Sequence, residues 1–98
     1  MKYESLNDQG IALIKKDQLN DAKLFFEKAI ELKPDFTDAL NNLGFVQHKL
    51  GKLDQAVRLY KQVVAIDSNY ALASENKILS VIYFFSQGNI QEALETLN

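Results

Sequence analysis

The sequence predicts an all-α fold, an α-solenoid of about six helices arranged as antiparallel pairs. The first observation is the scarcity of helix breakers: the 98 residues include only four glycines and one proline, too few for the many tight turns of an all-β domain. The second is that apolar residues recur at helical spacing. The third is an internal repeat, since Gly10 and Gly44 lie 34 residues apart, as do Ala22 and Ala56. A period of this length is typical of stacked helix pairs.

The first repeat, residues 3–36, contains two predicted helices, over residues 3–16 and 20–32. Each has its apolar residues on one face: Leu6, Gly10, Leu13 and Ile14 on the first helix, and Leu19, Ala22, Phe26, Ala29 and Ile30 on the second. Asp17 and Gln18 separate the two helices. Pro34 ends the repeat, because a proline disfavours helical geometry in the residue before it.

The second repeat, residues 37–70, follows the same plan, with predicted helices over residues 37–50 and 54–66. Gly51 is expected to end the first of them in the left-handed conformation, which glycine adopts without steric cost. Asp54 is expected to cap the start of the second helix. A turn at residues 67–69 closes the repeat.

The third repeat, residues 71–98, is irregular. Gly88 follows Gly51 by 37 residues rather than 34, so we expect about three extra residues in its first helix. The segment 78–85 has seven apolar residues in eight and is expected to be buried on nearly all sides. The final helix, residues 90–98, is short, and we expect the chain to be a fragment of something longer.

The mid-helix glycines Gly10 and Gly44 need a separate reason, because glycine inside a helix costs about 0.5–1 kcal/mol relative to alanine. A second helix packed too closely to leave room for a side chain supplies one. We expect Ala22 and Ala56 to be the small residues that face the glycines across this contact. In the third repeat Ile78 replaces the glycine, which weakens the expectation of close packing there.

These repeats resemble the tetratricopeptide repeat (TPR) family. The second repeat carries the family's pattern of Leu-Gly on the first helix, then alanine and an aromatic residue on the second, at Leu43, Gly44, Ala56 and Tyr60. The first repeat departs from it at Gln9, where leucine is usual. The resemblance implies a single TPR domain over residues 1–98, a right-handed superhelix, and a non-enzymatic scaffold for protein–protein contacts.

The resemblance also implies where a protein partner would bind. In TPR proteins the first helices line a concave groove that accepts an extended peptide or a helix. The matching positions here are Asn7, Asp8, Ile11, Ile14, Lys15, Asp38, Asn41, Asn42, Phe45, His48, Lys49, Leu72, Glu75, Asn76, Leu79 and Tyr83. The alternative for each is an exposed helix residue without a ligand.

Two known ligand patterns can be compared with these positions. The carboxylate clamp for acidic chaperone C-termini requires cations that the matching positions lack, and only Asn42 fits, so no clamp is predicted. Asp8, Asn42 and Asn76 recur at intervals of 34 residues. Asparagine can hydrogen-bond a peptide backbone without recognising its side chains. This series resembles the asparagine ladder in the repeats of O-linked N-acetylglucosamine transferase.

Composition argues against several other functions. With no cysteine and one histidine, His48, the sequence offers no thiolate zinc site, metal cluster or catalytic triad, so neither cofactor nor catalysis is predicted. A net charge of −2 argues against nucleic-acid and anionic membrane surfaces as partners. Neither a signal peptide nor a membrane span is visible, and a cytoplasmic location is predicted.

Two alternatives to groove binding stay open. The apolar third repeat, including Ile82, Phe84 and Phe85, offers a surface through which two copies could associate, so a homo-oligomer is the competing structural prediction. In the other alternative, the domain is an accessory segment of a larger enzyme such as a glycosyltransferase.

Overall fold

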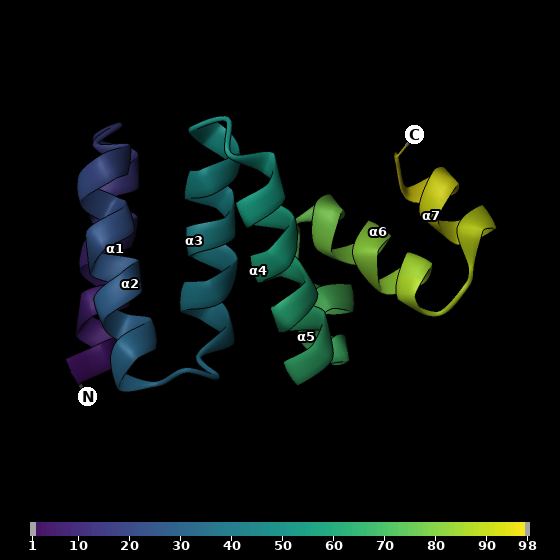
Figure 1. Cartoon of the computed structure of the whole chain (residues 1–98), viewed down its shortest axis with the longest axis horizontal. Helices are drawn as coiled ribbons and strands as arrows, with labels where there is room; N and C mark the ends of the chain where they lie inside the picture. Colours follow the sequence, from purple (N-terminus) through teal and green to yellow (C-terminus); the bar gives the residue numbers. More distant parts are fainter. Residues whose placement is uncertain (1, 98) are drawn as a thin grey trace.

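A computed structural model describes residues 2–97 as seven helices, and no strand occurs among these residues. The helices are α1 (Lys2–Lys15), α2 (Leu19–Leu32), α3 (Thr37–Lys49), α4 (Leu53–Ile66), α5 (Ser68–Ala73), α6 (Lys77–Ser86) and α7 (Ile90–Leu97). Figure 1 shows them following one another along the long axis of a molecule that measures 39 × 25 × 20 Å. The predicted all-α helical solenoid is confirmed.

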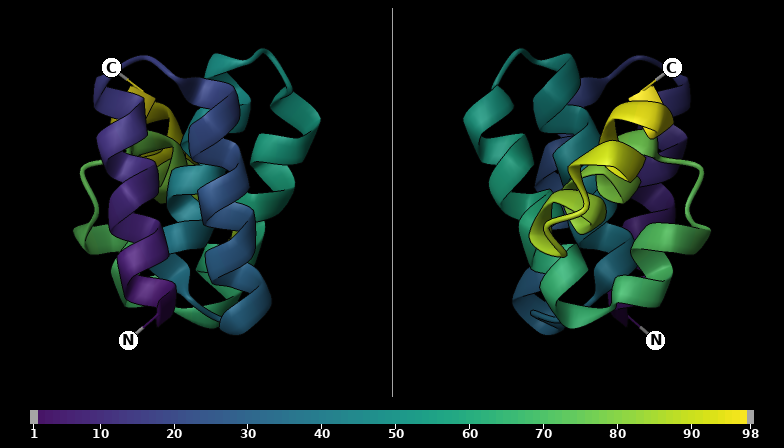
Figure 2. Two further views of the ribbon diagram at one scale, coloured as in Figure 1. Left: turned by 90° about the vertical axis from the view of Figure 1, so that its left-hand side faces the viewer. Right: turned by 90° about the vertical axis from the view of Figure 1, so that its right-hand side faces the viewer.

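The first four helices form two antiparallel pairs. α1 packs along α2 and α3 along α4, while α2 lies against α3, so that the first pair covers the second. The left view of Figure 2 shows α1 and α2 side by side. Further along the chain, α6 packs on α4 and α5, and α7 packs on α6. Each unit therefore contacts its neighbours in sequence, as stacked repeats do.

Gly10 and Gly44 lie at close helix contacts, and the atoms nearest to each belong to an aromatic ring of the partner helix. A Cβ atom on Gly10 would come within 2.5 Å of Cε1 of Phe26, and one on Gly44 within 2.6 Å of Cε1 of Tyr60. The prediction that Ala22 and Ala56 also lie at these contacts stays a prediction; both alanines are buried, each four residues before the aromatic residue on the same helix. The rings lie flat against the first helix of each pair because no side chain occupies that space.

The joints between paired helices share one backbone conformation. Gly51 has φ of 82° and Gly88 has φ of 74°, and Asp17, at the matching position of the first pair, has φ of 59°. The left-handed end predicted at Gly51 is confirmed. Asp54 was predicted as the N-cap of α4, but the cap is Lys52, and Asp54 lies in the first turn. A carboxylate there still interacts favourably with the positive end of the helix dipole.

The third unit has two short helices where one lengthened helix was predicted, which raises the total from about six to seven. The residues expected to form a turn, 67–69, instead begin α5, because the Asp67 side chain accepts a hydrogen bond from the Tyr70 amide at 3.1 Å. Residues 74–76 then interrupt the helix. The Ser74 hydroxyl accepts from the Asn76 amide at 3.0 Å, and the Asn76 side chain accepts from the Ile78 amide at 3.1 Å. These local bonds replace helical ones.

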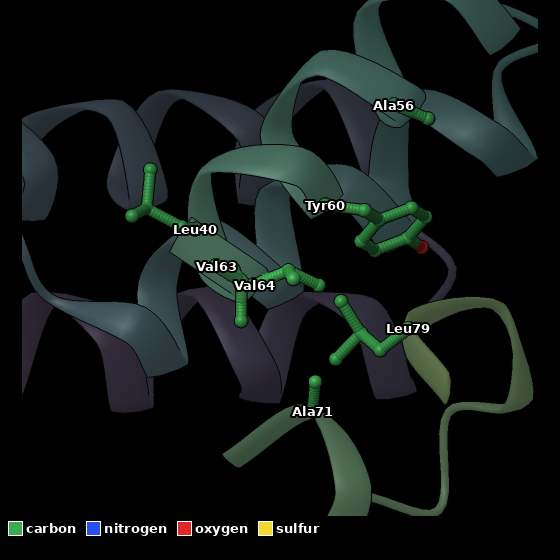
Figure 3. Packing of buried hydrophobic residues seen from close by; sticks show 7 residues of the cluster. All are labelled: Leu40, Ala56, Tyr60, Val63, Val64, Ala71 and Leu79. Atoms are coloured by element: carbon green, nitrogen blue, oxygen red, sulfur yellow. The ribbon is translucent and has the colours of Figure 1, made fainter. Parts of the chain in front are cut away.

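The core around α4 is continuous from the second pair into the third unit (Figure 3). It contains Leu40, Ala56, Tyr60, Val63, Val64, Ala71 and Leu79. Leu79 was predicted to line the groove, but it is fully buried in this cluster. The break before α6 rotates Leu79 toward α4, so it is unavailable to a partner.

The apolar segment 78–85 is less buried than the sequence predicts. Leu79 is buried, whereas Ile82 and Phe84 are half-buried and Phe85 is 51% exposed. The reason is that α7 has only eight residues and packs on one side of α6. The final helix was predicted to reach Asn98, which lies outside the described residues.

Candidate partner-binding groove

A pocket of about 630 Å³ opens between α1, α3 and the chain segment that begins α6. Its lining residues are Ile11, Ile14, Asn41, Asn42, Phe45, His48, Lys49, Tyr60, Ser74, Glu75, Asn76, Lys77 and Ile78. The sequence placed most of them in the groove, but it missed Tyr60, Ser74, Lys77 and Ile78. A volume of this size falls in the range of about 300–1,000 Å³ that is usual for ligand sites.

The other predicted groove residues do not line this pocket. Asn7 is buried, Leu72 and Tyr83 belong to the third unit away from the pocket, and Asp8, Lys15 and Asp38 are exposed outside its walls. The ring of Tyr83 packs against that of Phe84, with centroids 5.4 Å apart. The pocket is therefore shorter than a groove across three regular repeats.

The apolar part of the lining comes from three helices. Ile11 and Ile14 on α1 are half-buried, as are Phe45 on α3 and Ile78 at the start of α6. These side chains also pack against the two hydrophobic clusters of the core. The pocket thus presents an apolar surface held in place by the core, which suits a bulky apolar group of a partner.

Asparagine amides join the first helices of successive units. Nδ2 of Asn42 donates to Oδ1 of Asn7 at 3.0 Å, and Nδ2 of Asn76 donates to Oδ1 of Asn41 at 3.0 Å. Asn42 and Asn76, which were predicted to hydrogen-bond a peptide backbone, therefore each donate one hydrogen bond to a neighbouring unit. Each amide group still has a second N–H, because an asparagine side chain carries two.

Two lysines border the pocket without a carboxylate partner. Lys49 lies in the last turn of α3, with Nζ 5.5 Å from the centroid of the Phe45 ring, and Lys77 is the first residue of α6. Within residues 2–97 neither lysine forms an ion pair. Glu75 is the one acidic residue in the lining. The lining is therefore net positive on a chain whose net charge is −2.

Tyr60 connects the pocket to the core. Its side chain is buried, and its hydroxyl has no hydrogen-bond partner among the described residues. Burial raises the pKa of Tyr60, and this outweighs the opposite effect of the nearby Asn76 amide. Burial, followed by the nearby Asp38 carboxylate, raises the pKa of Tyr70 to about 12. Both phenols are therefore neutral at ordinary pH.

The repeats match known family models. A model described as a tetratricopeptide repeat matches residues 3–36, and a second model with the same description matches residues 25–58. The chain belongs to the tetratricopeptide repeat family. Proteins of this family generally bind protein partners and are generally non-catalytic.

Curated relatives of this TPR domain include proteins of plastid-bearing organisms. The chain is 31% identical over 67 residues, 68% of its length, to "Tetratricopeptide repeat domain-containing protein PYG7, chloroplastic" of Arabidopsis thaliana. It is 31% identical over 71 residues, 72% of its length, to "Uncharacterized protein ycf37" of Pyropia yezoensis. The matches span 22% and 40% of these two relatives.

Residues 2–97 of the TPR domain contain neither a candidate membrane span nor a candidate metal cluster. None of the helices there is both long and apolar enough to cross a membrane. No group of three or more histidine, aspartate or glutamate side chains in the same range could hold a metal ion.

Proposed function

We propose that this TPR domain is a protein-interaction module that binds a peptide segment or helix of a partner in the pocket between α1, α3 and residues 74–78. The observation that carries the proposal is the pocket itself, where apolar side chains such as Ile14 and Phe45 meet polar groups of Asn41, Asn42 and Asn76. A site of this composition provides apolar contact area together with a few orienting hydrogen bonds. TPR repeats in general bind protein partners, which supports the same reading.

Selection of peptides from a random display library tests the proposal. We expect selected peptides to lose at least about tenfold in affinity for the Phe45→Glu variant, because that change places a charge on the apolar lining. Leu24→Glu is the matched control, since Leu24 is exposed on α2 and lies outside the pocket. Selected peptides that bind both variants as tightly as the unchanged protein would contradict the proposal.

A second candidate function is self-association at the C-terminal end of the solenoid. Ile90, Leu94 and Leu97 occupy one stripe of α7 and are 57%, 52% and 62% exposed. Phe85 of α6 is also exposed, whereas Ile82 and Phe84, which were predicted for the same surface, are half-buried. An exposed stripe of this kind favours association with another apolar surface.

Two other expectations from the sequence stay predictions. One is the accessory role beside a catalytic domain such as a glycosyltransferase. The other is a cytoplasmic location, which the chloroplastic Arabidopsis relative does not support.

A further inference from the structure

We propose that the pocket selects a particular class of partner segment: a bulky apolar residue within the chain, with acidic residues on both sides of it. This inference rests on the proposed function, and it names the chemistry that the same pocket would recognise.

The apolar residue is inferred from the pocket lining. Ile11 and Ile14 of α1, Phe45 of α3 and Ile78 of α6 supply apolar surface on three different elements. Because the rest of the lining is mainly uncharged amide and hydroxyl groups, a partner gains most by burying one large aliphatic or aromatic side chain here. The adjacent amides of Asn41 and Asn42 can then orient the partner's backbone.

The acidic neighbours are inferred from the charges at the pocket. Lys49 and Lys77 have no carboxylate partner within residues 2–97, and Glu75 alone opposes them in the lining. Lys77 also lies in the first turn of α6, where the helix dipole favours an anion. Acidic side chains of a partner would form ion pairs with these lysines.

The position of the two lysines favours an internal segment over a chain terminus. Lys49 is at the end of α3 and Lys77 at the start of α6, so the cations belong to separate walls of the pocket. A single terminal carboxylate would leave one of them unpaired. Acidic residues before and after the apolar one can pair with both.

Titration of the labelled protein with defined peptides, followed by amide NMR shifts, tests the inference. The probe is Gly-Ser-Glu-Glu-Phe-Glu-Glu-Ser-Gly, acetylated and amidated at its ends. Its matched probes replace all glutamates with glutamine or with lysine, and a third probe carries phenylalanine at a free C-terminus as its only carboxylate. We expect the glutamate probe to bind roughly fivefold more tightly than the glutamine probe, with shifts at Asn42 and Phe45, since two exposed ion pairs contribute modestly.

Charge reversal provides the decisive control. In the double variant Lys49→Glu, Lys77→Glu we expect the preference to turn toward the lysine probe. The variant Lys28→Glu, Lys61→Glu has the same net charge change at exposed sites outside the pocket, and it should keep the preference for glutamate.

Two results would overturn the inference. One is equal affinity of the unchanged protein for the glutamate and glutamine probes, and the other is tighter binding of the free C-terminal probe. If peptides selected from the display library still bind the Phe45→Glu variant more weakly in either case, the proposed function stands and only the acidic preference is wrong. If no peptide depends on Phe45, both are wrong.

Discussion

At the scale of single residues, Gly44 shows how two opposing effects can be separated by their size. Replacing a helical glycine with alanine should stabilise the helix by about 0.5–1 kcal/mol. Here the new Cβ would lie 2.6 Å from the Tyr60 ring, and overpacking of this kind costs about 1–3 kcal/mol. We therefore expect Gly44→Ala to lower the free energy of unfolding by roughly 1–2 kcal/mol in urea denaturation. In a Tyr60→Leu background the same change should become neutral or stabilising; an equal loss in both backgrounds would show that the ring is not the cause.

The hydroxyl of Tyr60 leads to a second prediction at this scale. It is buried, and among residues 2–97 no group completes a hydrogen bond to it, although the Asn76 side chain is near enough to lower its pKa. An unsatisfied buried polar group costs about 1–3 kcal/mol. Tyr60→Phe keeps the ring against Gly44 and removes only the hydroxyl, so we expect the free energy of unfolding to rise by roughly 1 kcal/mol. Thermal and urea denaturation measure this, with Tyr3→Phe as the control. A loss of stability in Tyr60→Phe would mean that the hydroxyl has a partner in solution.

At the scale of helices, residues 74–76 decide both the shape of the third unit and one wall of the pocket. The Asn76 side chain accepts from the Ile78 amide and donates to Asn41, so one residue caps α6 and joins it to α3. We expect Asn76→Ala to cost about 1–2 kcal/mol of stability, because both bonds are lost. Asn41→Ala should cost less, since it keeps the cap.

A double-mutant cycle separates these two contributions. Combining Asn76→Ala with Asn41→Ala should cost less than the sum of the single changes, by about the energy of their shared hydrogen bond. Denaturation of all four proteins provides the measurement. Strict additivity would show that the bond between the two amides contributes nothing to stability.

At the scale of the whole molecule, the sequence predicts the structural features that recur in every repeat. It does not predict a feature that occurs in one repeat only. The 34-residue period places the helix pairs, because Gly10 and Gly44 fix the close contact within each pair. Nothing in that period signals the break at residues 74–76, which depends on hydrogen bonds from Ser74 and Asn76 to nearby amides.

The same distinction between recurring and local features explains which residues of the pocket could be predicted from the sequence. Residues of α1 and α3 such as Ile11, Asn42 and Phe45 could be placed by repeat position. Lys77 and Ile78 could not, because they enter the pocket only through the break, and the same break buries Leu79. Ser74 and Asn76 lie just before an apolar run, and serine and asparagine favour the N-cap position of a helix. They are the sequence signal that could have revealed the extra helix start.

The two ends of the solenoid differ, and this difference determines the kind of association to expect. On α3, Ala39, Leu43 and Val46 are apolar and buried, and the last two pack with Ala22 and Phe26 of α2. On α1 the residues 34 positions earlier are exposed and mostly polar: Ser5, Gln9 and Ala12. The N-terminal end therefore offers little apolar surface to another copy. A contact made by the α7 stripe would therefore use the C-terminal end of both copies, which gives a closed pair instead of a filament.

Light scattering across a concentration series tests this expectation. We expect the mass to rise from one chain toward two, and no further, at high micromolar protein, because burial of the α7 stripe drives the contact. Leu94→Glu with Leu97→Glu should hold the protein at one chain, since it places charges on that stripe. The control Leu24→Glu with Leu32→Glu alters leucines of similar exposure on α2 and should still pair. A single-chain mass for the unchanged protein throughout the series would rule out self-association, and masses above two chains would rule out the closed pair.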